Sequence, residues 1–288
     1  MSDGQNDSSR KAIEALLSER DIRINGERPW DLRVTNNDFY RRVLAGGSMA
    51  FGESYMDGWW ESAQIDELIT KILRNDPTGK LGLPWPVIIR ALLSRLSNTQ
   101  NQRAAFQNSQ AHYDRGNDLY RAMLDPRLLY TCAYWKDTTD LASAQTAKLD
   151  LVCKKLGLKP GQKVLDIGCG WGSFLKFAAE RYGVSGVGIT VAEEQVKLGR
   201  ELCAGKPIEI RLQDYRDVRG EFDHVVSLGM FEHVGRRNYR TFMRVVDRCL
   251  KDNGLFLLHT IGTLRSGTTF DPWMAKYPFP NAELPSVK

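Results

Sequence analysis

The segment VLDIGCGWG (residues 164–172) restricts the folds open to this chain more than any other part of the sequence. An apolar run at 163–167 leads into Gly168, Gly170 and Gly172, and an amphipathic segment follows at 173–182. A strand that turns through glycines into a helix lets a ligand approach the backbone, and the positive helix end favours an anionic group. The segment therefore predicts a ligand-binding strand–turn–helix unit.

Strand and helix patterns alternate through this part of the chain. The runs expected to be strands lie at 163–167, 184–189, 208–212, 222–228 and 255–259. The amphipathic segments expected to be helices lie at 173–182, 192–202 and 239–250. Such alternation is typical of a mostly parallel sheet with helices on both faces. We predict an α/β domain with a Rossmann-like parallel sheet and find no internal repeat.

The 288 residues leave room for a second domain before this sheet. Helical spacing of apolar residues begins near Ser8, and Gly, Pro and Asn interrupt the pattern at 22–60. We predict a smaller, mainly helical domain over residues 1–105 and the α/β domain over 106–288. The block GESYMDGWWE (52–61) fits a small aromatic core, or less readily a substrate-facing surface.

Residues 84–96 have the pattern of a basic amphipathic helix, with Arg90 opposite the apolar face and Arg95 at its flank. Acidic residues are absent between Asp76 and Asp114, so positive charge is concentrated there. Such a helix can lie in a lipid headgroup layer with its arginines toward phosphates. Taken alone, the segment favours packing against a neighbouring domain.

Composition excludes several classes of protein. Hydrophobic residues make up 42% and charged residues 26%, which is ordinary for a soluble protein. The chain has neither an uninterrupted apolar run of about 18 residues nor a signal-peptide pattern. The five cysteines form no C-x-x-C pair, which predicts a reduced cytoplasmic protein without a metal site. The net charge of +5 says little about nucleic acid, but the lack of a long basic stripe and of an Asn/Asp-Pro-Pro-aromatic motif disfavours nucleic-acid methylation.

The glycine turn differs from that of dinucleotide-binding enzymes. Its spacing is G-x-G-x-G, and the second strand ends at Thr190 without the acid that would hold a ribose. S-adenosylmethionine fits better, because Asp166 can serve its ammonium group through water or the backbone. Gln213 and Asp214 follow the third strand, where they can bind an adenine amino group. The alternative role for Asp166 is to cap the turn.

The motifs of this chain resemble those of the cyclopropane-fatty-acyl-phospholipid synthases and the mycolic acid cyclopropane synthases. They are GESYMDGWW (52–60), HYDRGNDLYRAMLDPRLLYTCAYW (112–135), VLDIGCGWG (164–172), QDYRD (213–217), GMFEHVG (229–235), LLHTIG (257–262) and DPWMAKYPFP (271–280). The resemblance implies an S-adenosylmethionine-dependent methyltransferase fold and a lipid-associated domain at 1–105, which favours a membrane or acyl-chain role for the helix at 84–96. It implies transfer of a methylene group from S-adenosylmethionine to the cis double bond of unsaturated phospholipid acyl chains.

The resemblance also implies site residues. The cofactor-binding set is Tyr130, Thr131 (a serine in the family), Asp166, Gly168, Gly170, Trp171, Gly172, Thr190, Gln195, Gln213 and Asp214. The first two close over the cofactor, Thr190 and Gln195 hold the ribose, and Gln213 and Asp214 lie near the adenine. In the family the catalytic base is a bound bicarbonate. Here the resemblance places it at Cys132, Glu232, His259 and the backbone amide of Ile261.

Taken singly, these residues also fit structural roles. Cys132 fits an inert buried thiol, Glu232 a turn cap and His259 a core histidine. His233 is assigned a structural role, and His112 and His224 have no predicted partner.

The resemblance further implies work at the inner face of the cell membrane, by a cytoplasmic, peripherally associated protein that can form a homodimer. Family members continue past this chain with a segment that carries the bicarbonate tyrosine, so we expect a C-terminally incomplete domain. Two alternatives stay open. One is a methyltransferase acting on a soluble small molecule, and the other is an inactive remnant that binds S-adenosylmethionine or lipid.

Overall fold

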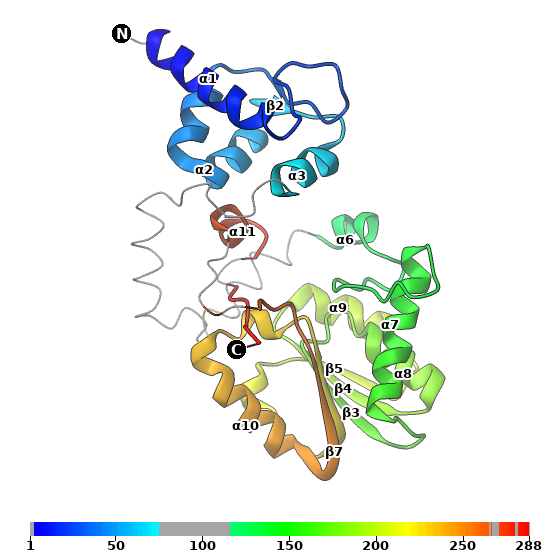
Figure 1. Cartoon of the computed structure of the whole chain (residues 1–288). Coiled ribbons are helices and arrows are strands. Elements are labelled where there is room, and N and C mark those ends of the chain that lie inside the picture. The colour runs from blue at the N-terminus through cyan, green and yellow to red at the C-terminus, as the bar shows by residue number, and fades with distance from the viewer. Residues whose placement is uncertain (1–2, 75–115, 265, 267–270, 280–281, 288) are drawn as a thin grey trace. The chain divides into compact units, whose positions relative to one another are not determined.

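The computed structural model describes residues 3–74, 116–264, 266, 271–279 and 282–287 (Figure 1). The chain divides into two compact units, one of Met1–Ser97 with Asp271–Pro278 and one of Asn98–Phe270 with Phe279–Lys288. The predicted domain boundary at residue 105, the helix pattern at 84–96 and His112 lie outside the described residues.

The second unit is built on a parallel sheet. Its described strands are β3 (Lys163–Ile167), β4 (Ser185–Thr190), β5 (Ile208–Leu212), β6 (Phe222–Leu228) and β7 (Leu250–His259). Their order is β5-β4-β3-β6-β7, and every neighbouring pair is parallel. The direction of winding therefore reverses between β3 and β6, which is where ligands bind in open α/β sheets.

Helices cover both faces of this sheet (Figure 1). They are α7 (Leu141–Leu156), α8 (Ser173–Tyr182), α9 (Glu193–Leu202) and α10 (Tyr239–Cys249). Leu165 and Val225 belong to an apolar cluster with residues of α10, whereas Val164 and Val226 belong to one with residues of α7 and α8. Successive strand residues point to opposite faces, so β3 and β6 are buried on both sides.

Strand β7 begins at Leu250, five residues before the predicted start at Leu255. Its register against β6 jumps from Phe222↔Leu250 to His224↔Leu255. His224, which had no predicted partner, is buried here and accepts a hydrogen bond at Nδ1 from the Leu255 N–H at 3.2 Å. An irregularity of this kind disturbs the alternation of apolar residues, so the sequence pattern shows only the later part of the strand.

The first unit is mainly helical. It contains α1 (Asp3–Ser18), β1 (Arg33–Val34), α2 (Asp38–Met56), β2 (Trp60–Glu61), α3 (Ile65–Arg74) and α11 (Pro272–Lys276). Its buried core residues are Ile13, Leu17, Ile22, Leu32, Phe39, Tyr40, Trp60 and Leu68. Within the 52–61 block, Trp60 is 2% exposed and stacks on Phe51, whereas Tyr55 and Met56 are exposed. The block thus contributes to both a core and a surface.

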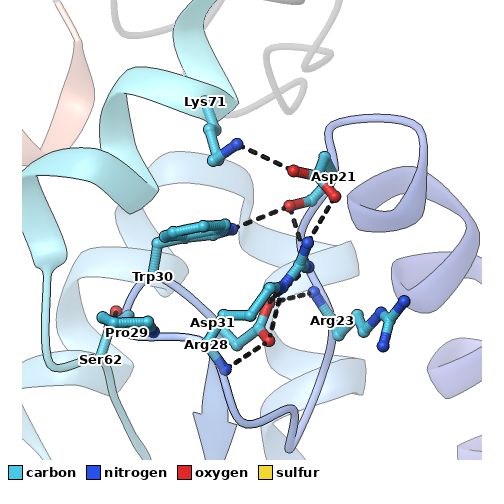
Figure 2. A network of polar contacts seen from close by, with 8 residues as sticks. All are labelled: Asp21, Arg23, Arg28, Pro29, Trp30, Asp31, Ser62 and Lys71. Carbon is cyan, nitrogen blue, oxygen red and sulfur yellow. Dashed lines mark hydrogen bonds and ion pairs between the residues drawn. The ribbon is translucent and has the colours of Figure 1, made fainter.

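A polar network around Arg28 holds the loop between α1 and β1 (Figure 2). The Arg28 guanidinium donates to the carboxylates of Asp31 and Asp21, and Lys71 on α3 also donates to Asp21 at 3.0 Å. The Trp30 ring is contacted by both cations, with Arg28 Cζ at 5.1 Å and Lys71 Nζ at 4.7 Å from its centroid. Burial, the largest single effect, acts to raise the pKa of Asp31, but the hydrogen bonds from Arg28 and from the Arg23 N–H, together with the Arg28 charge, outweigh it, and that pKa is lowered.

The segment Asp271–Pro278 was predicted to lie in the α/β domain but groups with the first unit. The reason is that α11 packs on α2. A Cβ built on Gly52 would lie 2.3 Å from Cδ1 of Trp273. Lys276 Nζ and Tyr277 OH donate to Glu53 Oε1 at 2.6 and 3.0 Å. The motif at 52–60 and residues 271–278 of the motif at 271–280 therefore belong to one unit.

This packing makes a prediction for Gly52. In the parent protein, Gly52→Ala should destabilise the fold by about 1–3 kcal/mol, because the added methyl group has no room beside the Trp273 ring. In a Trp273→Ala background the same change should become stabilising, by up to about 1 kcal/mol, because alanine is the better helix former. Urea unfolding followed by circular dichroism measures both changes. The same sign in both backgrounds would contradict this account of the contact.

Candidate active site

A cavity opens at the carboxyl ends of the parallel strands in the second unit. Its wall consists of the residues that follow β3, β4, β5 and β6, together with the loop that precedes α7. The lining residues from that loop are Leu128, Leu129, Tyr130 and Thr131. The loop follows α6 (Asn117–Met123), so the motif at 112–135 supplies a short helix and one side of the cavity.

The glycine turn after β3 gives the cavity its floor. Gly168, Gly170 and Gly172 have φ values of 84°, 54° and 80°, a region that residues with a Cβ rarely adopt. A Cβ on Gly168 would also lie 2.6 Å from the Met230 side chain. The Gly168 N–H donates to the Ile189 carbonyl at 2.9 Å, which ties the turn to β4. The backbone itself therefore forms this part of the wall.

Nearly all of the predicted cofactor residues line this one cavity. They are Tyr130, Thr131, Asp166, Gly168, Gly170, Trp171, Thr190, Gln195, Gln213 and Asp214. Gly172 does not line it. It precedes α8, and a Cβ there would lie 2.9 Å from both the Cys203 Sγ and the Ile210 Cδ1 atoms, so its place is structural. The Trp171 indole is 3% exposed and donates to Asn117 Oδ1 at 3.0 Å.

Asp166 presents a buried carboxylate to the cavity. It is 2% exposed, and its Oδ1 atom has no hydrogen-bond partner among the described residues. Burial raises its pKa to about 7, and the charge of Lys148 opposes this shift. An unpartnered buried carboxylate is costly unless a cation binds beside it, so the site fits a ligand with an ammonium group. The alternative role, in which Asp166 caps the turn, would give this carboxylate a backbone N–H donor.

Three of the other predicted polar side chains, Thr190, Gln195 and Asp214, are already paired. Thr190 Oγ1 donates to Gln195 Oε1 at 2.7 Å, and both residues are buried, which fixes the orientation of the amide. Asp214 accepts hydrogen bonds from the backbone N–H of Arg216 at 2.9 Å and from its guanidinium at 2.8 Å. Burial nevertheless raises the pKa of Asp214 above its ordinary value.

The four predicted catalytic residues form two contacts at the ends of β6 and β7. Cys132 Sγ lies 3.2 Å from His259 Nε2, and the Ile261 N–H donates to Glu232 Oε1 at 2.6 Å. Burial lowers the pKa of His259, Lys148 lowers it further, and Glu232 opposes them. The ring is therefore mainly neutral near pH 7.

Two atoms of this set are buried without a partner among the described residues, Glu232 Oε2 and His259 Nδ1. An unpaired carboxylate oxygen and an imidazole nitrogen fit a small anion that carries a proton, as bicarbonate does. The amide of Ile261 is already bonded to Glu232, so it is not free to hold such an anion in this arrangement.

Helix α7 holds the loop that joins the cavity to these residues. Gln145 Nε2 donates to the Thr131 carbonyl at 2.9 Å, and Lys148 Nζ donates to the Thr131 hydroxyl at 2.6 Å. Sequence reasoning missed both residues. The signal was present, since helical spacing places Gln145 and Lys148 on the same buried face as Ala144 and Val152.

His233 is a further residue whose role the sequence predicted differently. It was assigned a structural role, and the structure puts it in the cavity wall, with its ring centroid 6.3 Å from that of Phe279. Burial lowers the pKa of His233, which favours the neutral ring.

Comparison with known proteins gives concordant relatives. Residues 100–288 match the family described as mycolic acid cyclopropane synthetase. A cyclopropane-fatty-acyl-phospholipid synthase of Escherichia coli K12 is 52% identical over 273 residues, which cover 95% of this chain and 72% of that protein. A tuberculostearic acid methyltransferase of Mycobacterium tuberculosis H37Rv is 33% identical, over 86% of this chain and 62% of that protein.

Solved structures agree with this relationship. A mycolic acid cyclopropane synthase complexed with SAH and CTAB is 36% identical, with a TM-score of 0.59 over 63% of this chain and 70% of that one. A cyclopropane synthase from Mycobacterium tuberculosis is 32% identical, with a TM-score of 0.60 over 66% and 72%. The predicted methyltransferase fold is confirmed. The family match and the 52% identity show that this chain belongs to the mycolic acid cyclopropane synthetase family.

Proposed function

We propose that this chain transfers a methylene group from S-adenosylmethionine to the cis double bond of unsaturated phospholipid acyl chains, forming cyclopropane fatty acids. One observation carries the proposal. The strand ends that form the cofactor cavity adjoin those that bring Cys132, Glu232 and His259 together, in a chain 52% identical to a cyclopropane-fatty-acyl-phospholipid synthase.

The cavity would hold S-adenosylmethionine, which supplies a methyl group activated by its sulfonium charge. Asp166 would bind the ammonium of the amino-acid end, because its buried Oδ1 atom has no hydrogen-bond partner among the described residues. Thr190 and Gln195 would hold the ribose, and Gln213 and Asp214 would lie near the adenine. The positions of these residues around one cavity support the assignment.

For this reaction the protein must mainly position the alkene and exclude water from the reacting atoms. An alkene is a poor nucleophile, so it must be held close to the methyl group and aligned with it. Positive charge then develops on the acyl chain, and aromatic faces stabilise such charge. Tyr130 lines the cavity, with its ring centroid 5.7 Å from that of Tyr120 and 6.4 Å from that of Phe279. The Tyr130 ring, which the other two pack against, is suited to that role.

Ring closure releases a proton, and the site needs a group to accept it. Bicarbonate would supply a base when bound, and Cys132, Glu232, His259 and the Ile261 amide would hold it after that amide leaves Glu232. The neutral imidazole of His259 and the carboxylate of Glu232 can each receive a proton. Their unpartnered buried atoms support this part of the proposal.

The substrate would be met at the inner face of the membrane, by a cytoplasmic protein that associates with the surface and can form a homodimer. The name of the Escherichia coli relative, which specifies phospholipid acyl chains, supports the substrate class. None of the helices in the described ranges has the length and apolar character to cross a bilayer. The domain at 1–105 would supply the lipid contact.

Lipid mass spectrometry tests this function directly. The 288-residue chain would be expressed in a host that lacks cyclopropane synthase activity, and its phospholipids compared with those of the empty host. A gain of one methylene group on unsaturated acyl chains, and none on saturated chains, is expected. Binding of S-adenosylmethionine with no lipid product would instead indicate a soluble substrate or a remnant without catalysis.

Asp166→Asn should weaken binding of S-adenosylmethionine about tenfold to a hundredfold at pH 8, because a charged hydrogen bond is lost. In the parent protein, affinity should rise as pH increases through about 7, where the Asp166 carboxyl ionises. The variant should lack this dependence. Isothermal titration calorimetry from pH 6 to 8 measures both, with exposed Asp252→Asn as control. An unchanged pH dependence in the Asp166 variant would contradict the role.

The same substitution should stabilise the ligand-free protein. Burial raises the pKa of Asp166 above its unfolded value, so this group's contribution to stability is complete below about pH 4 and is lost as pH rises through 7. Asparagine does not ionise, so the variant does not lose this stability as the pH rises. The Tm of the variant should therefore exceed that of the parent at pH 8 by about 2–4 °C for each kcal/mol gained, and by less at pH 5. A lower Tm at pH 8 would show that the carboxylate stabilises the empty site.

Glu232→Gln should separate catalysis from cofactor binding. Loss of an acid–base group costs about a hundredfold or more in turnover, and Glu232 does not line the cofactor cavity. We therefore expect kcat to fall to that extent while the Kd for S-adenosylmethionine stays within about twofold. Exposed Glu201→Gln serves as the matched control. An equal loss of affinity and turnover would place Glu232 in cofactor binding instead.

A further inference from the structure

Lys148 on α7 is a buried lysine that contacts the loop between the cofactor cavity and the predicted catalytic residues. It is 4% exposed, and its ammonium donates to the Thr131 hydroxyl at 2.6 Å. No carboxylate in the described ranges lies within ion-pair distance of it. Lysine is almost never buried without a partner charge, because its ammonium loses hydration. The lost hydration of the Lys148 ammonium therefore calls for a functional explanation of this buried lysine.

Anchoring the loop backbone does not explain Lys148, because Gln145 already does so. The Gln145 side chain donates to the Thr131 carbonyl at 2.9 Å and to the Leu129 carbonyl at 3.3 Å. Lys148 adds two things that the amide does not. It orients the Thr131 hydroxyl, and it places a positive charge inside the site.

That charge acts on groups from both halves of the site. Burial lowers the pKa of Lys148 to about 8, while Cys132, Asp125 and Asp166 each raise it. The side chain is therefore mainly protonated near pH 7. Thr131 and Asp166 line the cofactor cavity, whereas Cys132 contacts His259.

We propose that Lys148 is a positioning residue, which holds Thr131 at the cofactor cavity and keeps a fixed positive charge beside Cys132 and His259. It acts through these residues and does not itself line the cavity. The inference rests on the proposed function and adds to it a residue that links the cofactor cavity to the proton-handling groups.

The proposal has a defined pH consequence. The groups that act on His259 are Lys148, Glu232 and Lys155, together with Cys132 in direct contact. Lys148 lowers the pKa of His259, so removing its charge should raise that pKa. If catalysis needs the neutral ring, the acidic limb of the kcat profile then moves to higher pH.

The test compares Lys148→Gln, which can still donate to Thr131 but has no charge, with Lys148→Arg, which keeps the charge. Lys154→Gln, on the exposed side of the same helix, is the matched control. The first readout is the pH profile of kcat on vesicles of unsaturated phospholipid. The second is the alkylation rate of the cofactor-free protein by iodoacetamide. It reports on Cys132, because this cysteine is exposed and the other four are buried.

We expect Lys148→Gln to move the acidic limb to higher pH and to change the alkylation rate several-fold, because Thr131, the chain neighbour of Cys132, loses its charged donor. Lys148→Arg and Lys154→Gln should match the parent in both. An unchanged limb and an unchanged rate in folded Lys148→Gln would overturn the proposal. If that variant does not fold, Lys148→Arg decides, because a shift in either readout would contradict a role for the charge.

The experiments distinguish failure of the proposed function from failure of the proposed role of Lys148. A parent chain that yields no cyclopropane product would contradict the proposed function, and the alkylation rates would still test Lys148. A parent chain that is active, with variants that alkylate alike and share its pH profile, would contradict only the role of Lys148.

Discussion

The site depends on the parallel register of β3 between β4 and β6. Because the three strands run in the same direction, the residues that follow each of them meet at one edge of the sheet. The reversal of winding at β3 and β6 sends the covering helices to opposite faces and leaves that edge open. The glycine turn then brings bare backbone to the opening, where a side chain at Gly168 would collide with Met230. A cavity at this edge follows from the topology, and the loop residues give it chemistry.

Several buried polar groups in the cavity and beside it lack partners that would stabilise them in the ligand-free protein. Asp166, Glu232 and His259 each have a buried polar atom without a partner in the described part of the chain, and Lys148 is a buried cation held by one hydroxyl. Buried groups of this kind reduce stability unless a ligand completes their hydrogen bonds. The arrangement favours binding, because a ligand can supply the hydrogen bonds that these buried atoms lack. Such a site lowers the stability of the ligand-free protein and, in return, raises its affinity for the ligand and supports catalysis.

The first unit is organised differently, because segments that are far apart in the sequence pack together around a small core. The Arg28 network joins the loop after α1 to α3 (Figure 2). Helix α11 returns from late in the sequence to pack on α2. Small domains bury a limited fraction of their surface, so such tertiary contacts contribute much of their stability. The ring of Trp273 against Gly52 shows why a glycine is required at that point of the helix.

The sequence alone determined the second unit's elements where a local pattern specifies them. The strands at 163–167, 208–212 and 222–228 and the helix at 173–182 have the predicted bounds, because apolar alternation, helical spacing and glycine turns are encoded by neighbouring residues. It also singled out Asp166, Gln213 and Asp214, which follow or end those strands and line one cavity, as candidate cofactor residues. The candidate roles of Cys132 and His259 came from family resemblance.

Only the tertiary structure decided which distant residues meet. Cys132 and His259 lie 127 positions apart, Asp271–Pro278 joins the first unit, and Lys148 lies beneath Thr131. The register break at His224, which lengthens β7, was likewise invisible in the pattern. Periodicity tells which face of an element is buried but not what it is buried against. Contacts of that kind depend on how whole elements pack, and that packing is a property of the complete fold.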